Sequence, residues 1–285
     1  AVLPAELQSA LLSRAEGNPL YTEEYVRMLE DRGLLRKEDG TWRLDQAEDF
    51  PLPESVQGIV AARLDALPAD EKALVQDAAV LGKVFWIGAV AAVGQKERSE
   101  IDQLLHALGR KEFVRRERRS SVAGEEQYTF LHVLVRDVAY GQIPRARRAL
   151  KHAAAAHWIN SLSADRSEDR AEMLAHHYLW ALEFARAAGQ EVESIAERAR
   201  VALREAGDRA YALNAFGSAA GFYEGAVALW APDQPDRGQL LLRYGRSLHL
   251  SDSTTDAIGP LEEARDLLLD AGESEVASEA EVTLG

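Results

Sequence analysis

Two short stretches carry residue types that could contact a ligand, and they lie more than a hundred positions apart. The first, EGNPLYTEEYV, places Gly17, Asn18 and Pro19 between two amphipathic segments. A proline at the first position of a helix needs no partner for its nitrogen, and its ring offers a stiff apolar face for a nucleobase. Gly17 permits a tight turn beside that ring. The alternative interpretation is a rigid corner between two helices.

The second stretch, QYTFLHVLVRDVAYGQI, runs from residue 127 to residue 143. Its first part is strand-like and its second part is an amphipathic helix, so His132 stands at the junction. An imidazole there could donate a hydrogen bond to an anion. The alternative is a histidine that caps or packs the helix.

Residue patterns of known catalytic and metal sites are absent. The nearest approach to a phosphate loop is Gly82-Lys83, but Val84 follows it and Asp77 stands where the first glycine is needed. There is no cysteine, no G-x-S-x-G and no H-E-x-x-H. The paired histidines have poor spacing for shared ligation: His152 with His157, and His176 with His177. We therefore expect no enzyme activity, no metal and no cofactor in this chain alone.

The elements that must position these residues are mostly helices. Two helices flank the proline corner, and LLRKEDGTWRL follows as a hairpin with Asp39-Gly40 as its turn. Prolines 51 and 53 then prevent a continuous helix, because proline lacks the backbone N–H and fixes φ. Residues 54–108 are expected to form three helices, the third with Ser99 as its N-cap, and FVRRE and QYTFLH a two-stranded hairpin. This order is typical of a winged helix with a small β-hairpin wing, in a mainly α protein.

The C-terminal half is rich in alanine and contains an internal repeat. Small residues and one large residue recur at offsets of 12, 16 and 19 from a glycine, in two frames 38 residues apart. The frames are Gly207, Ala219, Tyr223, Ala226 and Gly245, Ala257, Leu261, Ala264. Residues 172–190 and 193–210 would form a more divergent unit. The pattern resembles degenerate tetratricopeptide repeats, an array that binds partners; the alternative is a plain helical bundle.

Charge is distributed unevenly along the chain. The net charge is −14, yet residues 110–151 carry 11 Lys/Arg against 5 Asp/Glu, whereas residues 152–285 carry 11 against 23. Six basic residues gather on and beside the predicted wing: Arg110, Lys111, Arg115, Arg116, Arg118 and Arg119. They could contact phosphates of DNA, or dock on acidic neighbours within the protein. Because the flanking regions repel a phosphate backbone, we do not expect DNA as a partner.

We expect three domains, at residues 1–50, 51–150 and 151–285. No run of 18 apolar residues is present, so we expect no membrane partner. The absence of cysteine fits a cytoplasmic location. The first residues, AVLPAELQSALLSRA, read as an amphipathic helix without an initiator methionine or signal peptide. We infer that the chain is part of a longer protein.

The order of these motifs resembles a known family. EGNPLYTEEYVRMLEDRGLL, PLPESVQGIVAARLDALPADEKALVQDAAVLG, YTFLHVLVRDVAY and alanine-rich repeats follow one another as in the C-terminal half of STAND-class signalling ATPases. The likeness is greatest to the predicted ATPases that accompany bacterial adenylate/guanylate cyclase or LuxR-type DNA-binding domains. It extends over essentially the whole chain.

The resemblance implies roles for particular residues. Gly17, Asn18 and Pro19 match the Gly-x-Pro motif of the helical lid, which contacts the adenine. His132 matches the histidine of a Met-His-Asp-like motif that senses the β-phosphate of ADP, although Val133 replaces the aspartate. Residues 1–50 would be a lid remnant, 51–150 the winged helix and 151–285 the repeats.

The resemblance also implies the function and the partners. The chain would be a regulatory and sensor fragment that couples nucleotide state to binding at the repeats. Its partners would be its own N-terminal ATPase core, which holds ATP or ADP with Mg²⁺, and a protein or small-molecule inducer. The alternative is a winged-helix DNA-binding transcriptional regulator.

Overall fold

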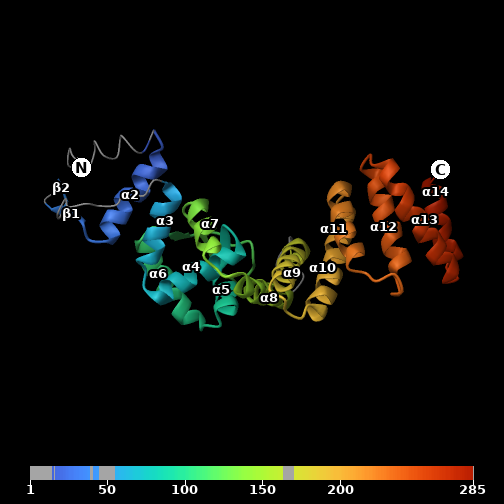
Figure 1. Ribbon diagram of the computed structural model, residues 1–285, viewed down its shortest axis with the longest axis horizontal. Helices are drawn as coiled ribbons and strands as arrows, with labels where there is room; N and C mark the ends of the chain where they lie inside the picture. Colours follow the sequence, from blue (N-terminus) through green and yellow to red (C-terminus); the bar gives the residue numbers. More distant parts are fainter. Residues whose placement is uncertain (1–14, 16, 39–40, 45–54, 163–169, 285) are drawn as a thin grey trace. The chain divides into compact units, whose positions relative to one another are not determined.

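The computed structural model describes Ala15 and residues 17–38, 41–44, 55–162 and 170–284. The chain is mainly helical, as predicted (Figure 1). The described residues form two compact units that divide between Pro144 and Arg145, shortly before the predicted boundary at residue 150. The predicted first helix, the hairpin turn at Asp39-Gly40 and the prolines at 51 and 53 lie outside the described residues.

Helix α2 (Pro19–Asp31) begins and ends where the sequence predicts. Asn18 is its N-cap and Pro19 its first residue, while Gly33, at φ +69°, ends it. The amide nitrogens of Gly33 and Leu34 donate to the carbonyls of Glu30 and Leu29, which is a Schellman arrangement. The strands β1 (Leu35–Glu38) and β2 (Thr41–Leu44) then pair in antiparallel register.

The rest of the first unit is a helical cluster with a small sheet. Its helices are α3 (Val56–Asp65), α4 (Ala69–Leu81), α5 (Ile87–Gly94), α6 (Arg98–Arg110) and α7 (Val133–Gly141). Its strands are β3 (Val84–Trp86), β4 (Val114–Arg116) and β5 (Gln127–Phe130), in the order β3-β5-β4 with antiparallel pairing throughout. Apolar side chains of these elements form one core that includes Phe85, Leu105, Phe113 and Phe130.

Two predictions for this unit were wrong. Residues 55–108 contain the start or whole of four helices instead of three, and they also contain strand β3, which pairs with β5. Gly82, at φ +124°, ends α4, and the β-branched and aromatic run Val84-Phe85-Trp86 suits an extended, buried strand. The N-cap of α6 is Glu97 rather than Ser99, and its side chain makes no capping bond.

The second unit is a succession of helices in which each packs against the next. They are α8 (Arg145–Ser161), α9 (Arg170–Ala187), α10 (Glu193–Ala212), α11 (Phe216–Ala228), α12 (Arg237–Leu250), α13 (Thr254–Asp270) and α14 (Ser274–Leu284). Figure 1 shows α12, α13 and α14 side by side, in orange to red. None of the helices in the described parts of the chain is both long and apolar enough to cross a bilayer.

The repeated glycines lie at the closest approaches between paired helices. A Cβ on Gly207 of α10 would lie 2.6 Å from the Tyr223 ring of α11, and one on Gly245 of α12 would lie 2.5 Å from Leu261 of α13. The large residue of each frame therefore packs within its helix pair. The helices of the predicted earlier unit, α9 and α10, pack against each other, while α9 also packs against α8 and α10 against α11.

This packing predicts opposite effects of adding one methyl group at two helical glycines. Gly207→Ala should lower the free energy of unfolding by roughly 1 to 3 kcal/mol, because the Tyr223 ring must move. Gly221→Ala on α11 meets no atom within 4 Å and should raise stability by about 0.5 to 1 kcal/mol through helix propensity. Urea unfolding followed by circular dichroism measures both; equal effects would contradict the close packing.

Candidate functional site

The Gly17-Asn18-Pro19 corner is exposed and built by backbone and capping bonds. Gly17 has φ +80°, the Asn18 nitrogen donates to the Ala15 carbonyl at 2.6 Å, and the Asn18 Oδ1 accepts from the Leu20 nitrogen at 3.1 Å. The side-chain oxygen of Asn18 is thus used to cap α2, and the Pro19 ring is exposed. Both interpretations of the corner, rigid turn and ligand platform, are compatible with this geometry.

Pro19 lies at one edge of an open pocket of about 510 Å³ on the surface of α2. Helix α2 supplies most of the wall, and Glu112 supplies the remainder from the turn between α6 and β4. The lining residues are Pro19, Thr22, Glu23, Val26, Arg27, Glu30 and Glu112. The pocket thus combines an apolar rim with four charged side chains.

His132 is the N-cap of α7, but its side chain makes no capping hydrogen bond. Its Nε2 lies 3.3 Å from the Nη1 of Arg27 and 3.9 Å from carboxylate oxygens of Glu23 and Glu24. Since a guanidinium can only donate, this hydrogen bond requires a lone pair on Nε2 and places the ring proton on Nδ1. His132 therefore packs against α2 through Arg27, a residue that also lines the pocket at Pro19.

Arg27 connects α2 with two other parts of the first unit. Its Nε donates to Glu112 at 2.6 Å, its Nη2 to Glu23 at 2.6 Å, and its Nη1 to Glu24 at 2.9 Å. Burial opposes the charge on Arg27, but the hydrogen bonds and charges of these carboxylates outweigh it and raise the pKa of the guanidinium. Arg27 is therefore a permanent cation that holds α2 to the α6–β4 turn and to His132.

Glu112 adopts a conformation that costs free energy. It has φ +57° and occupies the position after the C-cap of α6, where glycine is preferred. The amide nitrogens of Glu112 and Phe113 donate to the carbonyls of Gly109 and Leu108, as they would around a glycine. A glutamate here loses roughly 1 kcal/mol of backbone stability, which its bond to Arg27 offsets.

A buried ion pair lies beneath Arg27. The Nη1 of Arg63, on α3, donates to Glu24 at 2.5 Å, and each side chain is only 1 % exposed. Its Nε donates to Asp31 at 2.8 Å, its Nη2 donates to the Lys111 carbonyl at 2.8 Å, and its guanidinium lies 4.4 Å from the centroid of Phe113. Every side of the Arg63 guanidinium thus has a partner, which allows the charge to be buried.

The charge of this cluster is negative. Five carboxylates, those of Glu23, Glu24, Glu30, Asp31 and Glu112, surround the guanidiniums of Arg27 and Arg63. The Nζ of Lys111 is paired with Glu71 and does not compensate them. A bare phosphate would be repelled here, so a phosphate could reach His132 only together with cations supplied from elsewhere.

The basic residues predicted as a phosphate or docking surface divide into two groups. Lys111, Arg115 and Arg116 pair with Glu71, Glu117 and Glu126 respectively. Arg110, Arg118 and Arg119 are exposed, and they have no carboxylate within 4 Å in the part of the chain that is described. Of the six basic residues at the predicted wing, three arginines therefore keep an uncompensated charge in the described chain.

Two histidines that are 25 positions apart in the sequence lie together in the second unit. The Nδ1 atoms of His152 on α8 and His177 on α9 are 2.9 Å apart, and both side chains are buried. At that distance one ring donates from Nδ1 and the other accepts. Among the described residues no three His, Asp or Glu side chains are arranged to hold a metal ion.

Sequence reasoning missed Glu24, Arg27, Arg63 and Glu112. A usable signal existed for two of them. Glu24 falls on the same stripe of α2 as Tyr21, Tyr25 and Met28, and Arg63 falls beside Ile59 and Val60 on α3, so each charge stands on an apolar face. Two opposite charges on apolar faces of neighbouring helices predict a buried pair; nothing comparable marks Arg27 or Glu112.

Comparison with known proteins identifies one partial match. A family model described as a domain of unknown function (DUF8739) matches residues 1–43, a range that includes α2 and most of the hairpin β1–β2. No curated protein and no solved structure matches the chain.

The buried pair predicts a large effect of Glu24→Gln and a small effect of Glu30→Gln on the same helix. Loss of the Glu24 charge leaves Arg63 buried with one carboxylate and should cost roughly 3 kcal/mol. Burial and the charges of Asp31 and Glu112 raise the pKa of Glu30, so its ionisation destabilises the fold as pH rises. Glu30→Gln should therefore match or exceed the wild-type stability at pH 7. Urea unfolding at pH 5 and pH 7 tests this; equal losses in the two variants would contradict the assignment.

Proposed function

We propose that this chain is the regulatory and sensor part of a STAND-type signalling ATPase. In this proposal α2 belongs to the lid, α3 to α7 with the sheet β3-β5-β4 form a winged helix, and the second unit is an array of tetratricopeptide-like repeats. ATP or ADP with Mg²⁺ would be held by a core that lies elsewhere in the full-length protein. The output would be a cyclase or LuxR-type domain, in the cytoplasm.

The order of elements in the first unit supports the winged-helix assignment. Helix, strand, two helices, and two strands follow one another from α4 to β5, and the first strand pairs with the last. A winged helix has this order, with the connection between its last two strands as the wing. The repeat assignment is supported by the two equivalent helix contacts, Gly207–Tyr223 and Gly245–Leu261, at each of which a glycine lets the paired helices approach closely.

One observation carries the proposed switch. Pro19 and His132 are 113 positions apart, yet both lie near Arg27. Arg27 lines the same pocket as Pro19 and donates a hydrogen bond to His132 Nε2. A nucleotide whose base packs on Pro19 would bring its phosphates toward the same region. The negative charge of the cluster fits this only if the phosphates arrive with Mg²⁺ and the lysine of a phosphate loop, as the proposed ATPase core would provide.

The proposed mechanism is a competition for His132. Without nucleotide, Arg27 occupies the Nε2 of His132. With ADP, the imidazole would turn to the β-phosphate, and lid and winged helix would close on the core. Exchange to ATP and a signal at the repeats would favour the open arrangement, because the contacts of the nucleotide differ between the two states.

The test uses the full-length protein, with His132→Ala and, as the matched control, His106→Ala. His106 is an exposed histidine on α6 that lies beside Asp102. His132→Ala should weaken ADP binding by about tenfold, the effect of one hydrogen bond to a charged group, and should raise signalling without inducer. His106→Ala should leave both unchanged, and the 285-residue chain alone should hydrolyse no ATP. Unaltered ADP affinity in His132→Ala would refute the switch, and steady ATP turnover by the chain alone would favour an enzyme instead.

A second candidate function, DNA binding, rests on Arg110, Arg118 and Arg119, which are exposed and without carboxylate partners in the described chain. Such residues beside a wing could contact phosphates. Acidic residues on α6, among them Glu100 and Asp102, oppose insertion of that helix into a groove.

Filter binding to duplex DNA at about 50 mM and 200 mM salt separates the two functions. We expect weak binding with no difference between the wild type and Arg118→Ala/Arg119→Ala. Micromolar or tighter binding with a steep salt dependence, lost in the double variant, would favour the DNA-binding function.

A further inference from the structure

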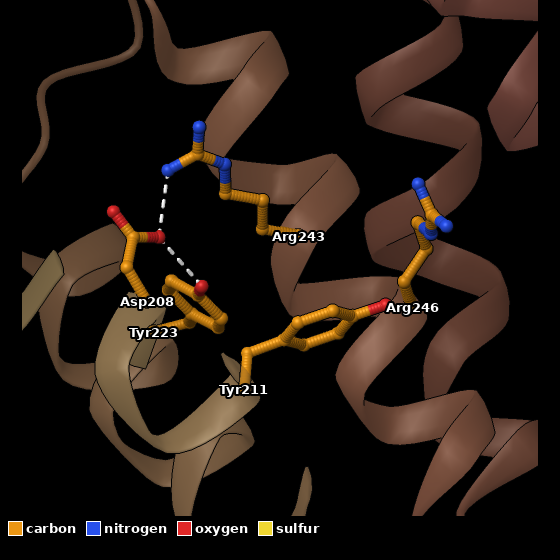
Figure 2. Close-up of a pocket in the computed structure, with 5 residues that line it drawn as sticks. All are labelled: Asp208, Tyr211, Tyr223, Arg243 and Arg246. Atoms are coloured by element: carbon orange, nitrogen blue, oxygen red, sulfur yellow. Dashed lines mark hydrogen bonds and ion pairs between the residues drawn. The ribbon is translucent and has the colours of Figure 1, made fainter. Parts of the chain in front are cut away.

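A second pocket lies within the helical unit and has a different chemical character. It has a volume of about 300 Å³ and is lined by residues of α10, α11 and α12: Asp208, Tyr211, Tyr223, Arg243 and Arg246. Figure 2 shows Asp208 beside Arg243 and Tyr223, with the Tyr211 ring extending from α10 toward α12. Two guanidiniums, one carboxylate and two aromatic rings thus line one small volume.

Asp208 fixes one side of this pocket. Its Oδ1 accepts from the Tyr223 hydroxyl at 2.7 Å and from the Arg243 Nη1 at 2.6 Å (Figure 2). Burial of the phenol and its hydrogen bond to Asp208 raise the pKa of Tyr223, so it remains a donor. Tyr223 is itself positioned by its contact with Gly207. The close packing of α10 on α11 therefore places the Tyr223 hydroxyl beside Asp208.

The two arginines retain unused donors. Arg243 and Arg246 are three residues apart on α12 and therefore share a face of the helix. The Nη1 of Arg246 donates to Glu279 at 2.7 Å, and no further acceptor for either guanidinium is seen among the described residues. Both ion pairs are close to half exposed, so each contributes little and an incoming anion displaces it at small cost.

We propose that this pocket binds a small organic anion with one anionic group, a carboxylate or phosphate monoester held by Arg243 and Arg246, and an aromatic or apolar body against Tyr211. Guanidiniums bind such planar or tetrahedral anions with paired hydrogen bonds, and tyrosine rings pack on apolar groups. The volume is at the lower end for ligand pockets. The net charge of −14 repels polyanions, which favours a ligand with a single charged group.

This proposal refines the sensor role by naming the chemistry of the inducer. It is tested on the 285-residue chain without nucleotide, so its failure is separate from failure of the nucleotide switch. The probes are benzoate, phenyl phosphate, inorganic phosphate and the neutral benzyl alcohol, each titrated by two-dimensional NMR of the labelled chain. Benzoate and phenyl phosphate represent the two sources of the anionic group.

At least one aromatic anion should bind saturably in the millimolar range or tighter, with shifts on α10 to α12. Arg243→Gln and Arg246→Gln should each weaken it by about tenfold. Arg265→Gln, which removes the same charge on α13 outside the pocket, should leave it unchanged. Inorganic phosphate and benzyl alcohol should bind far more weakly.

Three results would overturn the proposal. The first is that neither aromatic anion binds saturably up to about 10 mM. The second is equal affinity for the anion in the wild type and in the Arg243→Gln/Arg246→Gln double variant. The third is that inorganic phosphate binds as tightly as phenyl phosphate. Thermal unfolding of each variant verifies that the fold is retained.

Discussion

The ion pair between Glu24 and Arg63 is the constraint on which the placement of α2 against α3 depends. Both side chains are buried, and the pair joins α2 to α3. Burying a charge costs several kcal/mol unless it is matched, so α2 can adopt this position only where Glu24, Asp31 and the Lys111 carbonyl meet the guanidinium together. The contact of Arg27 with His132 follows from the same placement of α2.

The surroundings of Arg27 combine stability with strain. Three carboxylates and one imidazole converge on this guanidinium, and one of those carboxylates belongs to Glu112, which occupies a backbone conformation suited to glycine. Strained residues persist where the surrounding structure holds them. If α2 moved away, Glu112 would lose the bond to Arg27 that offsets its strain. The carboxylate of Glu112 would then be left without its cation.

The sequence predicted elements marked by local chemistry. Asn18-Pro19 and Gly33 set the ends of α2, and the glycine frames at 207 and 245 marked the helix contacts, because each depends on residues close in the chain. Strand β3 was not predicted, because its partner β5 is distant in the sequence. The joining of Pro19 and His132 through Arg27 depends on tertiary placement of α2, which no local pattern encodes. Whether a nucleotide uses them remains a proposal.

The mutual burial of Glu24 and Arg63 also constrains how this protein can evolve. Replacement of either residue alone leaves its partner charged and enclosed, whereas replacement of both by apolar residues can be neutral. Drift away from the pair must therefore pass through a less stable intermediate. Such a barrier preserves the two positions even in the absence of direct selection for a ligand.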